Sequence, residues 1–189
     1  MNTAAPTGTR ARTRRAILDA AVSVLARNIA ASLADIAAAA GVGRTTIHRY
    51  FPERSDLLAA LGTHVMEQVR QATERARLDD GTAAEALERL CQEYFEIGDG
   101  LLLTFDNPDV ANWADWEDDP ETDQSMTRLV ERGHADGTID PHMPAQWVMG
   151  LLWALLYAAW HHVREDGATR HGAVDLCLRT LRRSIRPGD

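Results

Sequence analysis

The chain has 189 residues, of which 45% are hydrophobic, and it carries a net charge of −8 at neutral pH. That length suffices for one domain with a proper core, or for two small ones. The longest apolar stretch, residues 147–160, falls short of the roughly 18–20 residues that cross a bilayer, and the polar N-terminus has no secretory pattern. We therefore expect a cytoplasmic globular protein without a membrane partner.

The first part of the chain is basic although the whole is acidic. Residues 1–9 are small and polar and predict a disordered N-terminus, and the apolar spacing that begins at Ile17 predicts a helix after them. Residues 1–56 hold eight arginines against four acidic residues, whereas the remainder holds 12 arginines against 24 acidic residues. A basic segment can still bind phosphates, because salt screens charges beyond roughly 8–10 Å. Among the arginines of residues 10–15, the candidate phosphate contacts are Arg12, Arg14 and Arg15.

Residues 32–58 combine several signals of a helix-turn-helix. Ser32 and Asp35 have the spacing of a capping box at the start of one short helix. Gly41 stands where the chain needs a left-handed turn, and a second short helix follows until Pro52. Such a motif presents its second helix to the major groove of DNA. The alternative is a plain helical hairpin in a bundle. The apolar residues expected to fix the crossing of the two helices are Ile36, Val42 and Ile47.

The elements expected beyond residue 53 are all helices. Gly81, Gly137 and Gly167 mark helix ends, and Gly98 with Gly100 can bend or break one helix. The acidic stretch 106–123 reads as an irregular loop, with a short helix at about 108–116 as an option. No stretch alternates as a strand does, so the predicted fold class is all-α. The expected helices cover residues 54–78, 82–105, 125–136, 144–165 and 169–185.

Aromatic side chains in this body are candidates for a ligand pocket, because such pockets are mostly apolar. Trp113 and Trp116 stand among carboxylates, a combination that can hold a cation. The alternatives are ordinary core residues and, for these two tryptophans, anchors of a solvated loop. The expected ligand is a small apolar or aromatic molecule. The pocket candidates are Tyr94, Phe105, Trp113, Trp116, Met126, Trp147, Met149, Trp153, Tyr157 and Trp160.

The expected helix 144–165 is apolar nearly all round, which predicts burial on more than one side. It carries a stripe of small residues at i, i+4 and i+8, which suits the close approach of another helix. With the apolar last helix, this pattern predicts a homodimer built on a twofold patch. The alternative is a monomer in which the last helix covers the surface. The candidate interface residues are Gly150, Ala154, Ala158, Val174, Cys177, Leu178 and Leu181.

No metal or catalytic site is marked in the sequence. Cys91 and Cys177 lie far apart in apolar helical patterns and are expected to be reduced core residues. The chain has no His-x-x-x-His or Cys-x-x-Cys spacing, and no nucleophile is paired with a base. We therefore expect no metal, no cofactor and no enzymatic activity.

Residues 12–60, above all IAAAAGV and TTIHRYFPERSDLL, resemble the DNA-binding head of TetR-type transcriptional regulators. The resemblance implies that residues 44–50 form the recognition helix. It further implies base contacts from Arg44, Thr45 and Arg49, and phosphate contacts from Thr46, His48, Tyr50 and Arg54, the last in place of a family lysine. A bidentate contact from Arg44 to guanine would contribute about 1–3 kcal/mol of discrimination.

The chain departs from the family pattern at three positions. Gly43 stands where a capping serine is common, Thr45 replaces a frequent glycine or proline, and His48 replaces the usual tyrosine. The loss of the serine predicts a recognition helix without a side-chain cap.

The predicted organisation is a helix-turn-helix DNA-binding domain at residues 10–53 and a helical ligand-binding and dimerisation domain at residues 54–189. The predicted function is that of a transcriptional regulator, a repressor released from a palindromic double-stranded DNA operator by a small molecule. The alternative is a helical small-molecule-binding or interaction protein whose helix-turn-helix does not read DNA.

Overall fold

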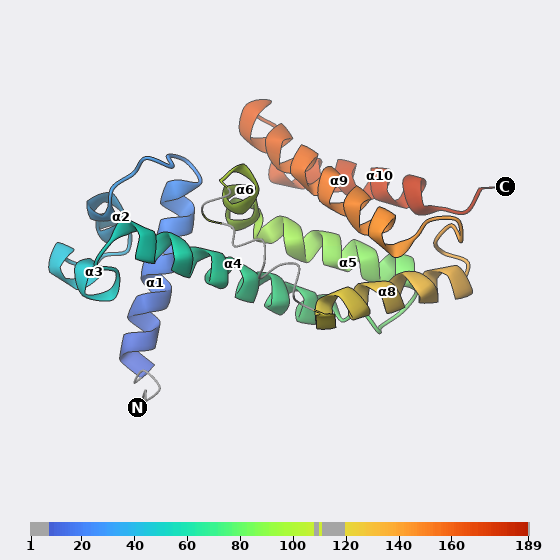
Figure 1. Cartoon of the computed structure of the whole chain (residues 1–189). Helices are drawn as coiled ribbons and strands as arrows, with labels where there is room; N and C mark the ends of the chain where they lie inside the picture. The colour runs from blue at the N-terminus through green and yellow to red at the C-terminus, as the bar shows by residue number, and fades with distance from the viewer. Residues whose placement is uncertain (1–7, 108–109, 111–119, 189) are drawn as a thin grey trace. The chain divides into compact units, whose positions relative to one another are not determined.

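The computed structural model describes residues 8–107, 110 and 120–188, with only the backbone course of residues 120–123. Every regular element in these residues is a helix, which confirms the all-α prediction (Figure 1). None of the described helices is both long enough and apolar enough to cross a membrane. Of the expected loop over residues 106–123, the structure describes only Asp106, Asn107, Val110 and the start of the following helix. Trp113, Trp116 and most of the optional helix lie outside the described residues.

The chain divides into two compact units. One contains α1 (Gly8–Leu25), α2 (Leu33–Ala39), α3 (Arg44–Tyr50), the first half of α4 (Arg54–Ala76) and nearly all of α6 (Gly98–Asp106). The other contains the second half of α4 together with α5 (Ala83–Glu96), α8 (Pro120–Ala135), α9 (Ala145–Glu165) and α10 (Arg170–Ile185).

Helix boundaries follow local signals in the sequence. The side chains of Ser32 and Thr82 each accept a hydrogen bond from the third residue of the helix they begin, and each forms a capping box, the one at Ser32 as expected. The four glycines expected to end helices all have left-handed backbone, with φ between +66° and +72°. These glycines are Gly41, Gly81, Gly137 and Gly167.

Three helices differ from the expected course. One is α8, which begins at Pro120, whereas the sequence predicts a loop up to residue 123 and a helix from residue 125. The helix expected over residues 82–105 is divided into α5 and α6 at Ile97 and Gly98. The cause is Trp160, whose indole Nε1 donates to the carbonyl of Phe95 at 3.3 Å. A Cβ at Gly98 would lie only 2.3 Å from that nitrogen, so glycine is required for this close approach. At the N-terminus, α1 includes Gly8 and Thr9, which were expected to be disordered. Thr9 accepts hydrogen bonds from two side chains, through its Oγ1 from Arg12 and through its carbonyl from Thr13.

Each unit has its own apolar core. In the second unit α10 packs on α9 and α5, while α8 packs on α5 and α9 (Figure 1). Tyr94 is buried there, stacks on Trp153 with ring centroids 4.9 Å apart, and shares a hydrogen bond of 2.8 Å with Thr73. In the first unit α2 packs on α1 and α3. The fully buried side chains of that unit include Ile17, Leu18, Ala21, Ile36, Ile47, Leu57 and Leu61.

Candidate nucleic-acid interface

The turn between α2 and α3 has the geometry of a helix-turn-helix. Gly41 has φ +66°, and the backbone N–H of Val42 donates to the carbonyl of Ala37 at 2.9 Å. Ile36, Ala37 and Ile47 are buried and hold the two helices together. Val42, which was expected to be buried in the turn and to help fix the crossing of the two helices, is only half-buried.

The outer face of α3 carries the residues expected to contact DNA. Arg44, Thr45, His48 and Arg49 are exposed, and Thr46 and Tyr50 are half-buried. Ile47 is buried on the opposite face, and Phe51 is buried where the helix ends. The helix therefore separates an apolar inner side from a polar outer side that is free to enter a groove.

Gly43 begins α3 as its N-cap residue, with φ −73° and ψ 156° and no side-chain hydrogen bond. As predicted, α3 therefore has no side-chain cap in the structure. Nothing lies within 4 Å of a Cβ built at Gly43, so a larger residue has room there.

His48 has one ring nitrogen engaged. Its Nδ1 lies 3.3 Å from the carbonyl oxygen of Pro52. Because a carbonyl can only accept, Nδ1 is the protonated nitrogen, and Nε2 of the neutral ring is then an acceptor. His48 can donate to a phosphate through Nε2 only as the imidazolium.

The arginines at the start of α1 divide between two faces of the helix. Arg14 lies over the ring of Phe51, with its Cζ 5.5 Å from the centroid, and Arg10 lies over the ring of Tyr50. Arg12 and Arg15 are exposed, and Arg12 donates to Thr9 Oγ1 at 3.2 Å. Arg10, which is absent from the predicted contacts, is thus placed beside the recognition helix. Its spacing of four from Arg14 and seven from the buried Ile17 is the sequence signal that could have identified it.

Arg54 at the start of α4 is not a freely solvated side chain. Its guanidinium donates to the main-chain carbonyls of Ile29 and Ala31, which lie between α1 and α2. The residue expected to contact phosphate therefore also holds the connection that leads into the helix-turn-helix.

Arginines in the first part of the chain differ from later ones in their ion pairs with carboxylates. In the described residues, the recorded pairs between arginine and a carboxylate all lie after residue 66. None of the eight arginines in residues 10–54 lies within 4.0 Å of a described carboxylate. Arg44 acts on Asp35 from a greater distance: hydrogen bonds from Ser32 are the main reason that the pKa of Asp35 is lowered, and Arg44 lowers it further. The basic surface of the first part is thus available to an external anion.

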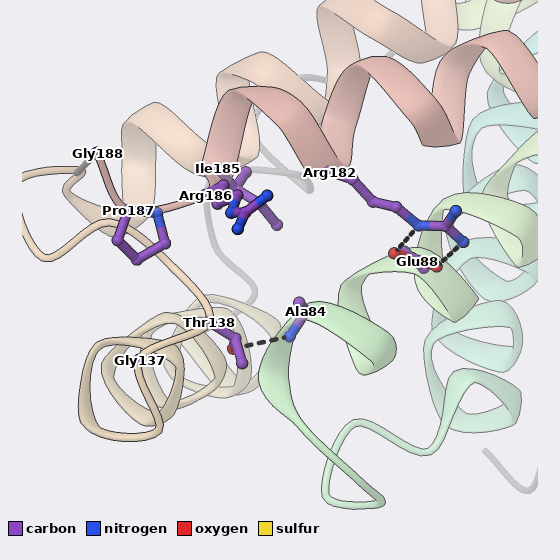
Figure 2. A pocket seen from close by; sticks show the side chains of 9 residues that line it. All are labelled: Ala84, Glu88, Gly137, Thr138, Arg182, Ile185, Arg186, Pro187 and Gly188. Atoms are coloured by element: carbon purple, nitrogen blue, oxygen red, sulfur yellow. Dashed lines mark hydrogen bonds and ion pairs between the residues drawn. The ribbon is translucent and has the colours of Figure 1, made fainter.

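The pocket candidates are not brought together around either of two cavities in the body. One cavity, of about 560 Å³, lies between the start of α5, the turn after α8 and the end of α10 (Figure 2). It is lined by Arg186 and by an Arg182–Glu88 ion pair, with Nη2 and Oε2 2.6 Å apart. The other, of about 400 Å³, lies between the end of α4 and α8. Neither is lined by an aromatic candidate.

The described candidates differ widely in exposure. Tyr94, Met126 and Trp160 are buried, whereas Trp147 and Tyr157 are exposed to 65% and 39%. Burial of the first group results from packing between α5, α8 and α9, which periodicity alone does not show. The remaining described candidates, Phe105, Met149 and Trp153, are half-buried.

The exposed face of α9 is apolar. Gly150, Ala154 and Ala158 are exposed along one side, with Trp147 and Tyr157 on the same side. Leu176 on α10 is exposed to 49%. Large exposed apolar side chains grouped in this way are typical of interaction surfaces. Val174 is half-buried, and Cys177, Leu178 and Leu181 are buried within the chain's own core, so these three support the surface from beneath.

Cys91 and Cys177 lie side by side in that core. Their Sγ atoms are 3.5 Å apart and share a hydrogen bond. This bond, together with burial, raises the pKa of Cys91, and the same bond lowers the pKa of Cys177. Both are free thiols, as expected. No group of three or more metal-ligating side chains is found among the residues that the structure describes.

A capped helix, a glycine corner, an exposed second helix and surrounding arginines without an ion pair to a described carboxylate define a helix-turn-helix DNA-binding protein. The sequence profile of the bacterial regulatory proteins of the tetR family matches residues 17–61. The HTH-type transcriptional repressor LfrR of Mycolicibacterium smegmatis is 42% identical over 178 residues, which cover 94% of this chain and 93% of LfrR. The chain therefore belongs to the TetR family.

Solved structures show the same fold. The structure of LfrR from Mycobacterium smegmatis in complex with proflavine matches with a TM-score of 0.75 at 38% identity, and covers 94% of this chain and 99% of that one. A TetR family regulator from Marinobacter aquaeolei matches with a TM-score of 0.69 at 21% identity, over 95% of this chain and 99% of that one. The second match concerns the fold alone.

Proposed function

We propose that this protein is a sequence-specific DNA-binding repressor that acts in the cytoplasm as a homodimer on a palindromic operator. The observation that carries the proposal is the set of arginines around α3 without a carboxylate partner among the described residues. Such cations bind DNA by releasing counterions from phosphates. The repressor LfrR, 42% identical, supports the direction of regulation.

Within this proposal, residues 10–53 form the DNA-binding domain and residues 54–189 the regulatory domain. Arg44, Thr45 and Arg49 on the exposed face of α3 contact bases. The flanking side chains contact phosphates, and these are Arg12, Arg14, Arg15, Thr46, His48 and Arg54, while Tyr50 lies beside them at the end of α3.

DNA binding is tested by selecting operator duplexes with the wild-type protein and measuring the affinity of variants. Arg44→Ala should relax the preference at one base position, with a loss of about 1–3 kcal/mol on the preferred sequence. Arg15→Ala should weaken all sequences equally and reduce the salt slope by about one. If both variants bind as the wild type does, the assignment of α3 and α1 to the interface is wrong.

The second copy is proposed to pack on the exposed apolar face of α9 and α10. Ala154 and Ala158 leave room there for the close approach of a helix, and Trp147, Tyr157 and Leu176 supply the apolar area. Ala154→Arg should convert a dimer into a monomer in sedimentation experiments, because it places a charge in the contact. Arg164→Ala, an exposed change nearer the end of α9, is the matched control and should leave the dimer intact. A dimer that survives Ala154→Arg would refute this surface.

We further propose that a small aromatic cation is the releasing ligand. The support is the proflavine complex of LfrR, together with the sequence of residues 106–123, which combines two tryptophans with eight acidic residues. Proflavine should raise the melting temperature of the DNA-free protein, since a ligand that binds the folded state stabilises it. Acridine, the uncharged parent ring system, should do so less. If both compounds raise the melting temperature equally, the protein does not recognise the positive charge of proflavine.

A further inference from the structure

The ring of Tyr50 is shared by two arginines from different helices. Cζ of Arg10 in α1 lies 5.9 Å from the ring centroid, and Cζ of Arg49 in α3 lies 5.6 Å from it. Both distances are within the roughly 6 Å over which an aromatic ring attracts a cation. Tyr50 itself is half-buried, so its ring is a fixed platform, while both arginines are exposed.

The register of α1 directs Arg10 toward this ring. Arg10, Arg14 and Leu18 follow one another at intervals of four and therefore lie on one face of the helix. Leu18 is buried in the core of the unit, and Arg14 lies over Phe51, which directly follows Tyr50. The face of α1 that packs on the core at Leu18 therefore also carries Arg14 and Arg10, which lie beside the C-terminal end of α3.

Two guanidinium groups over one ring leave an uncompensated positive charge. The C-terminal end of α3 supplies a partial negative charge, but less than one unit. Neither Arg10 nor Arg49 is within ion-pair distance of any carboxylate that the structure describes. An external anion with several acceptor oxygens satisfies both groups, and on DNA that anion is a backbone phosphate.

We propose that Tyr50 acts through its ring as a positioning residue that holds Arg10 beside Arg49, so that Arg10 contacts the DNA backbone next to the recognition helix. The inference rests on the proposed DNA-binding function. It adds Arg10 to the interface, and it assigns the effect of Tyr50 to the ring in place of a phosphate contact by the hydroxyl.

The test compares wild type, Arg10→Ala, Tyr50→Phe, Tyr50→Leu and the double variant Arg10→Ala/Tyr50→Leu on an operator duplex selected with the wild type. Arg10→Ala should lose roughly three- to thirty-fold in affinity and should reduce the salt slope by about one. Tyr50→Phe keeps the ring and should bind as the wild type does. Tyr50→Leu should lose at least as much as Arg10→Ala, because it also removes the ring beside Arg49. The double variant should lose no more than Tyr50→Leu alone.

Arg27→Ala is the matched control, because Arg27 is an exposed arginine of the same unit that lies over no ring. The proposal is overturned if Arg10→Ala binds as Arg27→Ala does, or if Tyr50→Phe loses as much as Tyr50→Leu. The first result removes Arg10 from the interface, and the second assigns the contact to the hydroxyl. Arg10→Ala and Tyr50→Phe decide the matter even if Tyr50→Leu does not fold. A wild type that selects no duplex would instead overturn the proposed function.

Discussion

Nε2 of His64 in α4 lies 2.8 Å from Oδ1 of Asp19 in α1. The His64 side chain is only 9% exposed, whereas Asp19 is half exposed. The pair therefore joins the first half of α4 to α1 by a polar contact at the edge of the core. Since α1 also carries the arginines beside α3, this contact links the start of the long helix to the surface proposed to bind DNA.

Replacing Asp19 with alanine should destabilise the protein by about 1 kcal/mol, because it removes one hydrogen-bond partner of a nearly buried imidazole. The free energy of unfolding from urea titration measures this change. Ser23→Ala, an exposed change in the same helix, should have a smaller effect. Equal effects of the two changes would show that the Asp19–His64 contact contributes nothing specific.

Gly43→Ser should stabilise the protein by only about a few tenths of a kcal/mol, because serine at an N-cap accepts a hydrogen bond from the first turn but glycine is itself a good N-cap residue. The backbone of Gly43 is already extended, and its Cβ would meet nothing within 4 Å. Thermal unfolding of the serine and alanine variants isolates the cap, since alanine adds the Cβ without the hydroxyl. If the serine and alanine variants have the same melting temperature, the serine hydroxyl does not cap α3.

Arg54→Ala should lower both stability and DNA affinity, whereas a pure phosphate contact would lower affinity alone. The reason is that its guanidinium serves the carbonyls of Ile29 and Ala31. Loss of these bonds should cost about 1–3 kcal/mol of unfolding free energy. Arg54→Lys keeps the charge, but an ammonium group does not have the planar guanidinium geometry that donates to both carbonyls. The stability of this variant should therefore remain below that of wild type. A lysine variant as stable as wild type would contradict the stabilising role of the two hydrogen bonds from the Arg54 guanidinium.

Stability should fall in acid partly through Asp136. Burial acts to raise the pKa of this carboxyl, but hydrogen bonds from Thr138 and from the backbone N–H of Ala83 leave it lowered. A group with a lowered folded pKa contributes stability above its unfolded value, about 3.9, and loses it as pH falls through the folded value. Asp136→Asn should therefore be less stable at neutral pH and should show a flatter decline below pH ~4 in urea titrations. If the free energy of unfolding of Asp136→Asn falls with pH as steeply as that of the wild type, this carboxyl does not contribute to the loss of stability in acid.

Much of the fold could be predicted because its signals are local. The caps at Ser32 and Thr82 and the left-handed glycines act within a few residues, so the sequence alone locates the helix ends. The helix-turn-helix is predictable for the same reason. The glycines allow a break in the helix expected over residues 82–105, but its position at Gly98 depends on Trp160, 62 positions along the chain, reaching the carbonyl of Phe95.

The exposure of the candidate DNA contacts was predictable on α3, and the contacts around α3 were less so. Exposure of Arg44 and Arg49 follows from helical periodicity. The contact of Arg10 with Tyr50 and the hydrogen bonds of Arg54 to residues 29 and 31 depend on how separate helices pack. Likewise, periodicity does not distinguish an aromatic side chain that lines a pocket from one such as Tyr94, which stacks in the core.

The most direct test of the central claim is a footprint of the wild-type protein on the DNA upstream of its own gene at moderate salt. A repressor that presents α3 to the major groove should protect a palindromic site, and Arg44→Ala should weaken that protection at symmetric positions in both halves. The absence of any protected site, with protein that is folded and dimeric, would contradict the account and favour a helical binding protein that does not read DNA.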